Sequence, residues 1–190
     1  MNKDIRLRPM LLRDLDSEYC TWYNNSDGHL DWFSGTGRSF DAEELARSFE
    51  EGQRTKKWFN YIIEDSTTSR IGNVRIGPID LLNRTSDLVT LIGNRAFLRK
   101  GIAAIAIRQA NQIAFEQHGI RRLQTGMLAT NTPSIKAYTR AGWFIEATFR
   151  GFYWRDEQPV DRICVACLNP VFFPDVGRGS ESTDRTEDLK

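Results

Sequence analysis

The chain has 190 residues, of which 40% are hydrophobic and 27% charged, and its formal net charge is +1. A chain of this length folds as one ordinary domain that hides roughly 70% of its unfolded surface, so its core needs no disulfides or metal. The composition excludes a fibrous or wholly disordered protein, and the balanced charge gives no general attraction to nucleic acid or anionic membranes.

The first residues and the cysteines indicate the compartment. Residues 1–8 contain no apolar segment of the kind found in secretory signals. The longest apolar run, residues 102–107, is too short to cross a bilayer. The three cysteines are odd in number and too few for a disulfide framework. We therefore expect a cytoplasmic protein with free thiols that binds neither membranes nor nucleic acid.

Hydrophobic periodicity predicts the elements in chain order. The expected strands cover residues 5–7, 58–64, 70–79, 87–93, 122–128, 143–153 and 160–168. The expected helices cover residues 11–23, a segment that begins at Ser39, residues 101–118 and residues 132–141. Strands follow one another early in the chain and helices alternate with strands later. We therefore expect an α/β (α+β) fold around a mixed, mostly antiparallel sheet.

Two segments are expected to lie outside regular structure. Residues 24–38 contain a cluster of turn-forming residues followed by a loop. Residues 177–190 contain one large apolar side chain, Leu189, so burial cannot offset the entropy of ordering them. We expect one domain over residues 1–170 and a disordered tail over residues 171–190.

The most informative segment joins a strand that ends at Gly93 to a helix that begins at Gly101. Small residues such as Ala103 leave the amide groups of the first helical turn uncovered. Together with the helix dipole, Arg99 and Lys100 make this loop a suitable site for a pyrophosphate. The same pattern also fits a helix whose basic residues are merely solvated. The motifs of standard ATP and NAD loops are absent.

A second segment runs from residue 131 to residue 143. Asn131 follows a predicted strand, and Pro133 and Ser134 open a helix. Ser134 and Tyr138 share one face of that helix by their spacing. A tyrosine in a helix is, by itself, more typical of packing than of catalysis.

Together, these two segments and the order of elements resemble the GNAT superfamily of acetyl-CoA-dependent N-acetyltransferases. The resemblance extends over residues 5–168. It implies a fold in which two strands of the mixed sheet separate at a bulge and helices cover both faces. It also implies acetyl-CoA as the acyl donor, no metal, and a small-molecule amine as the other substrate of a monomer or homodimer.

The resemblance assigns roles residue by residue. Tyr138 matches the tyrosine that commonly protonates the departing thiolate, and a backbone N–H near Leu91 or Ile92 would polarise the thioester carbonyl. Two departures, Leu98 in place of Gln or Arg and Arg99 in place of a frequent Gly, put the cofactor affinity in doubt. The implied cofactor contacts are Leu91, Ile92, Gly93, Arg99, Lys100, Gly101, Ile102, Ala103, Asn131 and Lys136.

The general base stays open among Asp87, His29, Asp31 and Glu146. His118 follows a helix, where the dipole would favour its positive charge, and we expect no catalytic role for it.

The acceptor site is expected to contain His29, Trp32 and Arg75. Aromatic stacking together with an Arg fork suits a sugar nucleotide, although the same aromatic residues also fit a core. Further aromatic candidates for this site are Phe33, Tyr153 and Trp154.

The sequence leaves three functions open. The patterns that begin at Trp22 and Ile71 resemble two branches of the superfamily and favour the one that acetylates amines of nucleotide-linked sugars. The other branch acetylates the N-termini of ribosomal proteins. The third possibility is an acyl-CoA-binding module without catalysis.

Overall fold

The structure is a computed structural model that describes residues 4–24 and 39–175. Its centre is a seven-stranded sheet in the order β1-β2-β3-β4-β5-β7-β6. Neighbouring strands are antiparallel except for β4 and β5, which are parallel. The strands are β1 (Arg6–Pro9), β2 (Phe59–Glu64), β3 (Arg70–Asp80), β4 (Thr85–Ile92), β5 (Arg122–Leu128), β6 (Phe144–Arg155) and β7 (Gln158–Leu168).

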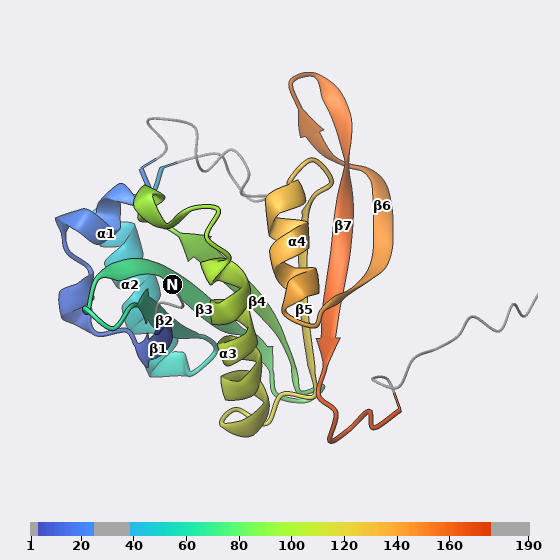
Figure 1. Cartoon of the computed structure of the whole chain (residues 1–190), viewed down its shortest axis with the longest axis horizontal. Helices are drawn as coiled ribbons and strands as arrows, with labels where there is room; N and C mark the ends of the chain where they lie inside the picture. Colours follow the sequence, from blue (N-terminus) through green and yellow to red (C-terminus); the bar gives the residue numbers. More distant parts are fainter. Residues whose placement is uncertain (1–3, 25–38, 176–190) are drawn as a thin grey trace, which may run out of the picture.

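Helices cover both faces of this sheet (Figure 1), as expected. The larger core joins α3 and α4 to one face through residues such as Ala106, Leu88 and Tyr138. A second cluster, which includes Tyr19 and Ile62, joins α1 and α2 to the other face. The helices are α1 (Ser17–Thr21), α2 (Ala42–Thr55), α3 (Ile102–Glu116) and α4 (Thr132–Arg140).

The helix predicted over residues 11–23 is wrong as a continuous element. The chain forms a 3-10 turn over Leu12–Asp14 and then the separate helix α1. The Asp14 side chain accepts a hydrogen bond from the Leu11 amide at 2.8 Å, and the Asp16 side chain accepts one from the Tyr19 amide at 3.0 Å. In a continuous helix these backbone N–H groups would bond to backbone carbonyls of the helix. Because each aspartate side chain accepts such a hydrogen bond instead, it favours the start of a separate helical segment.

The other predicted elements are confirmed with small shifts of their ends. The helix expected from Ser39 begins at Ala42, because Asp41 caps it and exchanges hydrogen bonds with Glu44 in a capping box. The predicted turn and loop over residues 24–38 lie outside the described residues from residue 25 onward, as does the predicted tail from residue 176. The described residues 171–175 continue as turns, and Arg84 lies over the Phe172 ring.

His118 differs from the expectation of a charged helix end. Its ring stacks on Phe59 with centroids 4.1 Å apart, and its Nε2 atom lies 3.0 Å from the Tyr61 hydroxyl. Burial lowers the pKa of His118, so the neutral ring is favoured at neutral pH.

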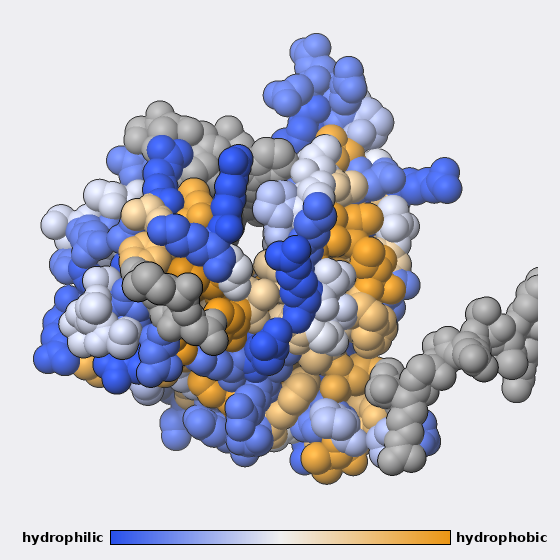
Figure 2. Space-filling model, viewed as in Figure 1, coloured by the Kyte–Doolittle hydropathy of each residue, from blue (hydrophilic) through white to orange (hydrophobic). Residues whose placement is uncertain are grey.

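Strand β6 forms one edge of the sheet and exposes large apolar side chains. They contribute to the apolar surface on the right of Figure 2. An open edge of this kind offers backbone groups and apolar area to another chain. The expected choice between monomer and homodimer stays a prediction. The exposed residues are Phe144, Ile145, Phe149, Phe152 and Trp154.

A buried ion cluster fixes the start of the chain against β2. Both guanidinium Nη atoms of Arg8 lie 2.7 Å from the Asp14 carboxylate, and its Nε donates to Glu64 at 2.8 Å. Burial by itself raises the pKa of Asp14, but Arg8 and the Leu11 amide outweigh it, so the pKa lies below its ordinary value. The carboxylate is therefore stabilised in its charged form.

Replacing Asp14 with asparagine should lower the free energy of unfolding by about 2 kcal/mol at neutral pH, because it removes the carboxylate that both Nη atoms of Arg8 contact and leaves Arg8 with Glu64 alone. Urea denaturation at several pH values measures this. The folded-state pKa is depressed, so the contribution is complete above the ordinary aspartate value of 3.8 and is lost as the pH falls through the lower folded value. Asp16→Asn is the control, since Asp16 is exposed and Asn still caps α1. Equal losses in both variants would contradict a special role for the buried pair.

Candidate active site

The sheet opens between β4 and β5. These strands pair over Thr85–Asp87 and Arg122–Gln124 only, although they continue to Ile92 and Leu128. Beyond Asp87, one edge of β4 bonds to β3 while the other has no strand beside it. The expected pair of separated strands is thus present, and backbone N–H and C=O groups along β4 are available to a ligand.

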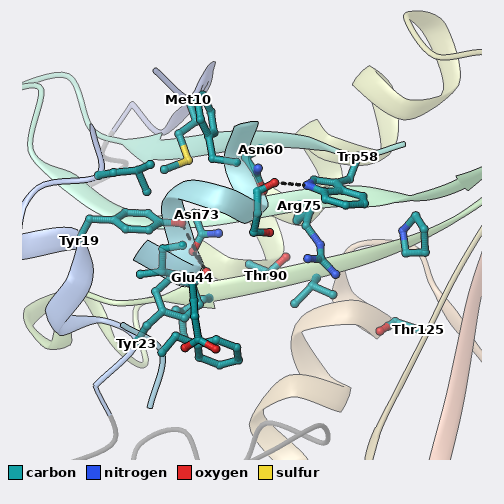
Figure 3. A pocket seen from close by; sticks show the side chains of 18 of the residues that line it. Met10, Tyr19, Tyr23, Glu44, Trp58, Asn60, Asn73, Arg75, Thr90 and Thr125 are labelled. Atoms are coloured by element: carbon teal, nitrogen blue, oxygen red, sulfur yellow. Dashed lines mark hydrogen bonds between the residues drawn. The ribbon is translucent and has the colours of Figure 1, made fainter. Parts of the chain in front are cut away.

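A cavity of about 920 Å³ lies at this separation, and Figure 2 shows the surface hollowed there. Its size lies within the range that small-molecule and cofactor sites occupy. The β4 and β5 residues that line it are Val89, Thr90, Leu91, Thr125, Gly126 and Met127. Helix α4 contributes Asn131, Ser134 and Tyr138, and the remainder comes mainly from α1, α2 and β3 (Figure 3).

Helix α4 positions Tyr138 in this cavity. The Asn131 side chain accepts a hydrogen bond from the Ser134 amide at 3.2 Å and so caps the helix. The Tyr138 hydroxyl donates to the Leu88 carbonyl at 2.8 Å, and its ring packs edge-on against Trp143. Burial raises the pKa of Tyr138, and contact with Thr90 offsets this only in part. The hydroxyl therefore keeps its proton at neutral pH and can act as an acid.

The start of α3 presents uncapped amides. Gly101 adopts a left-handed conformation with φ of 76°, and no side chain caps the helix. Arg99 is also left-handed, with φ of 59°. The first turn contains no acidic residue, so the amides and the positive end of the dipole suit an anion. Lys100 Nζ lies 5.4 Å from the centre of the Phe97 ring.

The predicted cofactor residues fall into separate places. Leu91 and Asn131 line the cavity, whereas Arg99 to Ala103 form the loop and first turn at the start of α3. Lys136 is exposed on α4. Gly93 has a packing role, because a Cβ atom there would lie 2.2 Å from the Trp22 ring. Neither Lys136, Ile92 nor Gly93 lines the cavity.

The predicted acceptor residues divide in a similar way. Arg75 lines the cavity and is half-buried. His29 and Trp32, together with Asp31 and Phe33, lie outside the described residues. Tyr153 and Trp154 stand near the end of β6 and do not line the cavity, and the Trp154 side chain is 68% exposed.

Two of the candidate bases can be located. Glu146 is exposed on β6 and pairs with Arg122, which lowers the pKa of its carboxyl. Asp87 belongs to the last residue pair before β4 and β5 separate and is half-buried. Burial raises the pKa of Asp87, while a hydrogen bond to Gln124 and two nearby arginines act in the opposite direction.

Tyr19, Tyr23 and Asn73 form a polar part of the cavity wall that no sequence pattern predicted. The Tyr19 hydroxyl lies 3.5 Å from that of Tyr23, which donates to Asn73 at 3.1 Å. Tyr19 belongs to the apolar stripe of the helix predicted over residues 11–23, and it is buried. No sequence signal links these tyrosines to Asn73, since the contact joins residues 50 positions apart.

Within the part of the chain that the structure describes, no group of three or more His, Cys, Asp or Glu side chains could hold a metal ion. None of the helices within 4–24 and 39–175 is both long and apolar enough to cross a membrane.

Comparison with known proteins gives a family and a fold. Residues 4–143 match the family model described as an acetyltransferase (GNAT) domain. A spermidine N-acetyltransferase from Vibrio cholerae in complex with CoA and spermine has a TM-score of 0.79 and 16% identity, covering 90% of this chain and 98% of that one. A spermidine/spermine N-acetyltransferase from the same organism, in complex with manganese ions, has a TM-score of 0.72 and 17% identity over 90% and 96% of the two chains. No curated protein matches the chain significantly. At these identities the solved structures establish the shared fold.

Proposed function

Because the chain belongs to the GNAT acetyltransferase family, we propose that it transfers the acetyl group of acetyl-CoA to a primary amine of a small molecule. The acceptor we favour is an amino sugar or a nucleotide-linked amino sugar. The observation that carries the proposal is the buried, protonated Tyr138 at the cavity between the separated strands.

The residues present fit acetyl-CoA, which supplies a thioester when bound. Leu91 and Ile92 at the end of β4, and Gly93 directly after it, have backbone N–H and C=O groups on the side toward β5. No strand pairs with β4 on that side beyond Asp87, so these groups can bind a ligand. The uncapped amides from Arg99 to Ala103 fit a pyrophosphate. We assign further cofactor contacts to Asn131 and Lys136. The Vibrio cholerae structure with CoA shares this fold.

The chemistry needs a base, a hydrogen-bond donor and an acid, and we assign the base and the acid to side chains and the donor to the backbone. An amine attacks only in its neutral form, and we assign the removal of its proton to Asp87, acting through water because Asp87 does not line the cavity. A backbone N–H of Leu91 or Ile92 stabilises charge that develops on the carbonyl oxygen. Tyr138 then protonates the leaving sulfur.

The cavity wall supports a polar acceptor with hydroxyl groups. Tyr23 and Asn73 offer hydrogen-bonding groups, and Arg75 offers a fork for phosphate. A polyamine acceptor is the first alternative, because the structurally similar Vibrio cholerae enzymes are named for spermidine. An N-terminal peptide of a ribosomal protein is the second, based on the sequence resemblance alone.

A thiol-release assay with acetyl-CoA tests the function. We expect release with a UDP-linked amino sugar that exceeds the background rate without acceptor. Spermidine and a ribosomal N-terminal peptide, at equal concentration, serve as competing acceptors. Release with the peptide only would reject a small-molecule acceptor. Binding of CoA without release for any amine would instead indicate an acyl-CoA-binding module.

A further inference from the structure

Within the part of the chain that the structure describes, Arg75 places a positive charge inside the cavity with no counter-charge in contact. Its side chain extends from β3 toward the cavity, beside the ring of Trp58 (Figure 3). Among residues 4–24 and 39–175 it forms no hydrogen bond or ion pair, and its one ring contact is with Trp58, 5.8 Å from the ring centre. By contrast, Arg70 on the same strand pairs with Asp16 and Glu18.

The ring beneath Arg75 is held firmly. The Trp58 indole N–H donates to the Ser48 carbonyl of α2 at 3.0 Å. A Cβ atom at Gly52 would lie 2.3 Å from the Trp58 ring, and one at Gly77 would lie 2.4 Å from Trp58 Cβ. Trp58 is therefore packed closely between α2 and β3, and its cation–π contact orients the guanidinium without neutralising it.

The neighbours of Arg75 on the sheet are uncharged. Its cross-strand partners are Asn60 on β2 and Val89 on β4, and Asn73 precedes it on the same face. The carboxylate whose pKa it influences, Asp87, forms no ion pair with it and is also influenced by Arg162. Asp87 does not line the cavity and therefore does not neutralise Arg75 by direct contact.

Helix α2 supplies the other charged groups of the cavity. Glu44 accepts a hydrogen bond from the Asp41 amide in the capping box. Arg47 and Glu51 are exposed and oppose one another in charge. These groups therefore leave the half-buried guanidinium of Arg75 available to an anion from solution.

We propose that Arg75 determines acceptor specificity by binding an anionic group, a phosphate or a carboxylate, that the amine acceptor carries. The proposal rests on the proposed acetyltransferase function. A guanidinium binds either anion through two parallel hydrogen bonds. The same charge disfavours a polycation such as spermidine, because it would place like charges together in a partly desolvated site.

The test compares acceptors that differ only in the anion. Glucosamine 1-phosphate and glucosamine form one pair, and β-alanine and β-alaninamide form the other, so the two pairs distinguish phosphate from carboxylate. We expect kcat/KM to be higher for the anionic member of at least one pair. Arg75→Gln should lower that value roughly 10- to 100-fold, mainly through KM, and change the value for the neutral member little.

Two further variants sharpen the result. Arg75→Lys should retain part of the preference for the anionic acceptor. Lysine keeps the positive charge but lacks the planar guanidinium that makes two parallel hydrogen bonds to an anion. Arg54→Gln removes an exposed charge of α2 that does not line the cavity. It should leave kcat/KM unchanged for both the anionic and the neutral acceptors. Equal effects of Arg75→Gln on both members of each pair, or a kcat/KM for spermidine that does not rise in this variant, would overturn the proposal.

Binding measurements separate this proposal from the proposed function. Calorimetric titration of the CoA-bound protein with the same four amines reports anion preference even without turnover. Tighter binding of the anionic members that is lost in Arg75→Gln would support the anion site, whether or not acetyl transfer occurs. Equal affinity for anionic and neutral members would refute it even in an active enzyme.

Discussion

Replacing Tyr138 with phenylalanine is expected to lower kcat roughly 10²- to 10⁴-fold, the range for loss of a general acid. The hydroxyl that now donates to the Leu88 carbonyl is the buried proton donor at the cavity. The ring and its contact with Trp143 remain in the variant, so CoA binding should change little. Steady-state kinetics with acetyl-CoA and calorimetric titration with CoA measure the two quantities.

Tyr61→Phe is the matched control for this variant. Tyr61 is also buried and also loses one hydrogen bond, that to His118, but it does not line the cavity. Both variants should show similar thermal stability, while only Tyr138→Phe should lose turnover. Equal kcat in wild type and Tyr138→Phe would remove the assigned role as an acid.

The second large effect is expected at the start of α3. Gly101→Glu should weaken CoA binding by about 100-fold, or roughly 2.7 kcal/mol. The new carboxylate would face a pyrophosphate of like charge at the positive end of the helix. Space is not the reason, since a Cβ atom at Gly101 meets nothing within 4 Å. Isothermal calorimetry with CoA gives the affinity directly.

Two variants separate charge from backbone strain. Gly119 lies beyond the other end of α3, is also left-handed with φ of 63°, and also has open space around it. Gly119→Glu therefore carries a similar strain without a charge near the first turn, and its CoA affinity should be normal. Gly101→Ala isolates the strain at the site itself. If Gly101→Glu bound CoA as tightly as Gly119→Glu, no anion would lie at the start of α3.

Local patterns predicted most of the fold. The strand predicted over residues 122–128 matches β5 at both ends, because alternation and flanking turns define it. The helix α3 was also predicted closely, since Gly101 and its apolar periodicity mark where it begins. Residues 11–23 show the same apolar spacing, but the side chains of Asp14 and Asp16 bond backbone amides and divide the segment into a 3-10 turn and α1. Periodicity carries no information about such contacts.

The sequence predicts those site residues that lie close together in one segment of the chain. It does not predict contacts between residues that are far apart in the sequence. Asn131 and Tyr138 lie within one helix and its cap, so their spacing alone places them together. The position of Arg75 over Trp58 depends instead on how β2, β3 and α2 pack, which only the structure gives. The wall of Tyr19, Tyr23 and Asn73 likewise joins distant segments.

Strands β4 and β5 pair over three residue pairs, so β1 to β4 and β5 to β7 form two parts of the sheet that share a short paired segment, here called the joint. Strands β1 to β4 make up the first plate, and β5 to β7 make up the second. Arg75 and Leu91 belong to the first plate, while Tyr138 follows the first strand of the second. A donor seated across the joint would stiffen it and set the distance between the acceptor's anchor and the acid. The acceptor would then meet a rigid site only after the donor is in place, which favours an ordered sequence of binding.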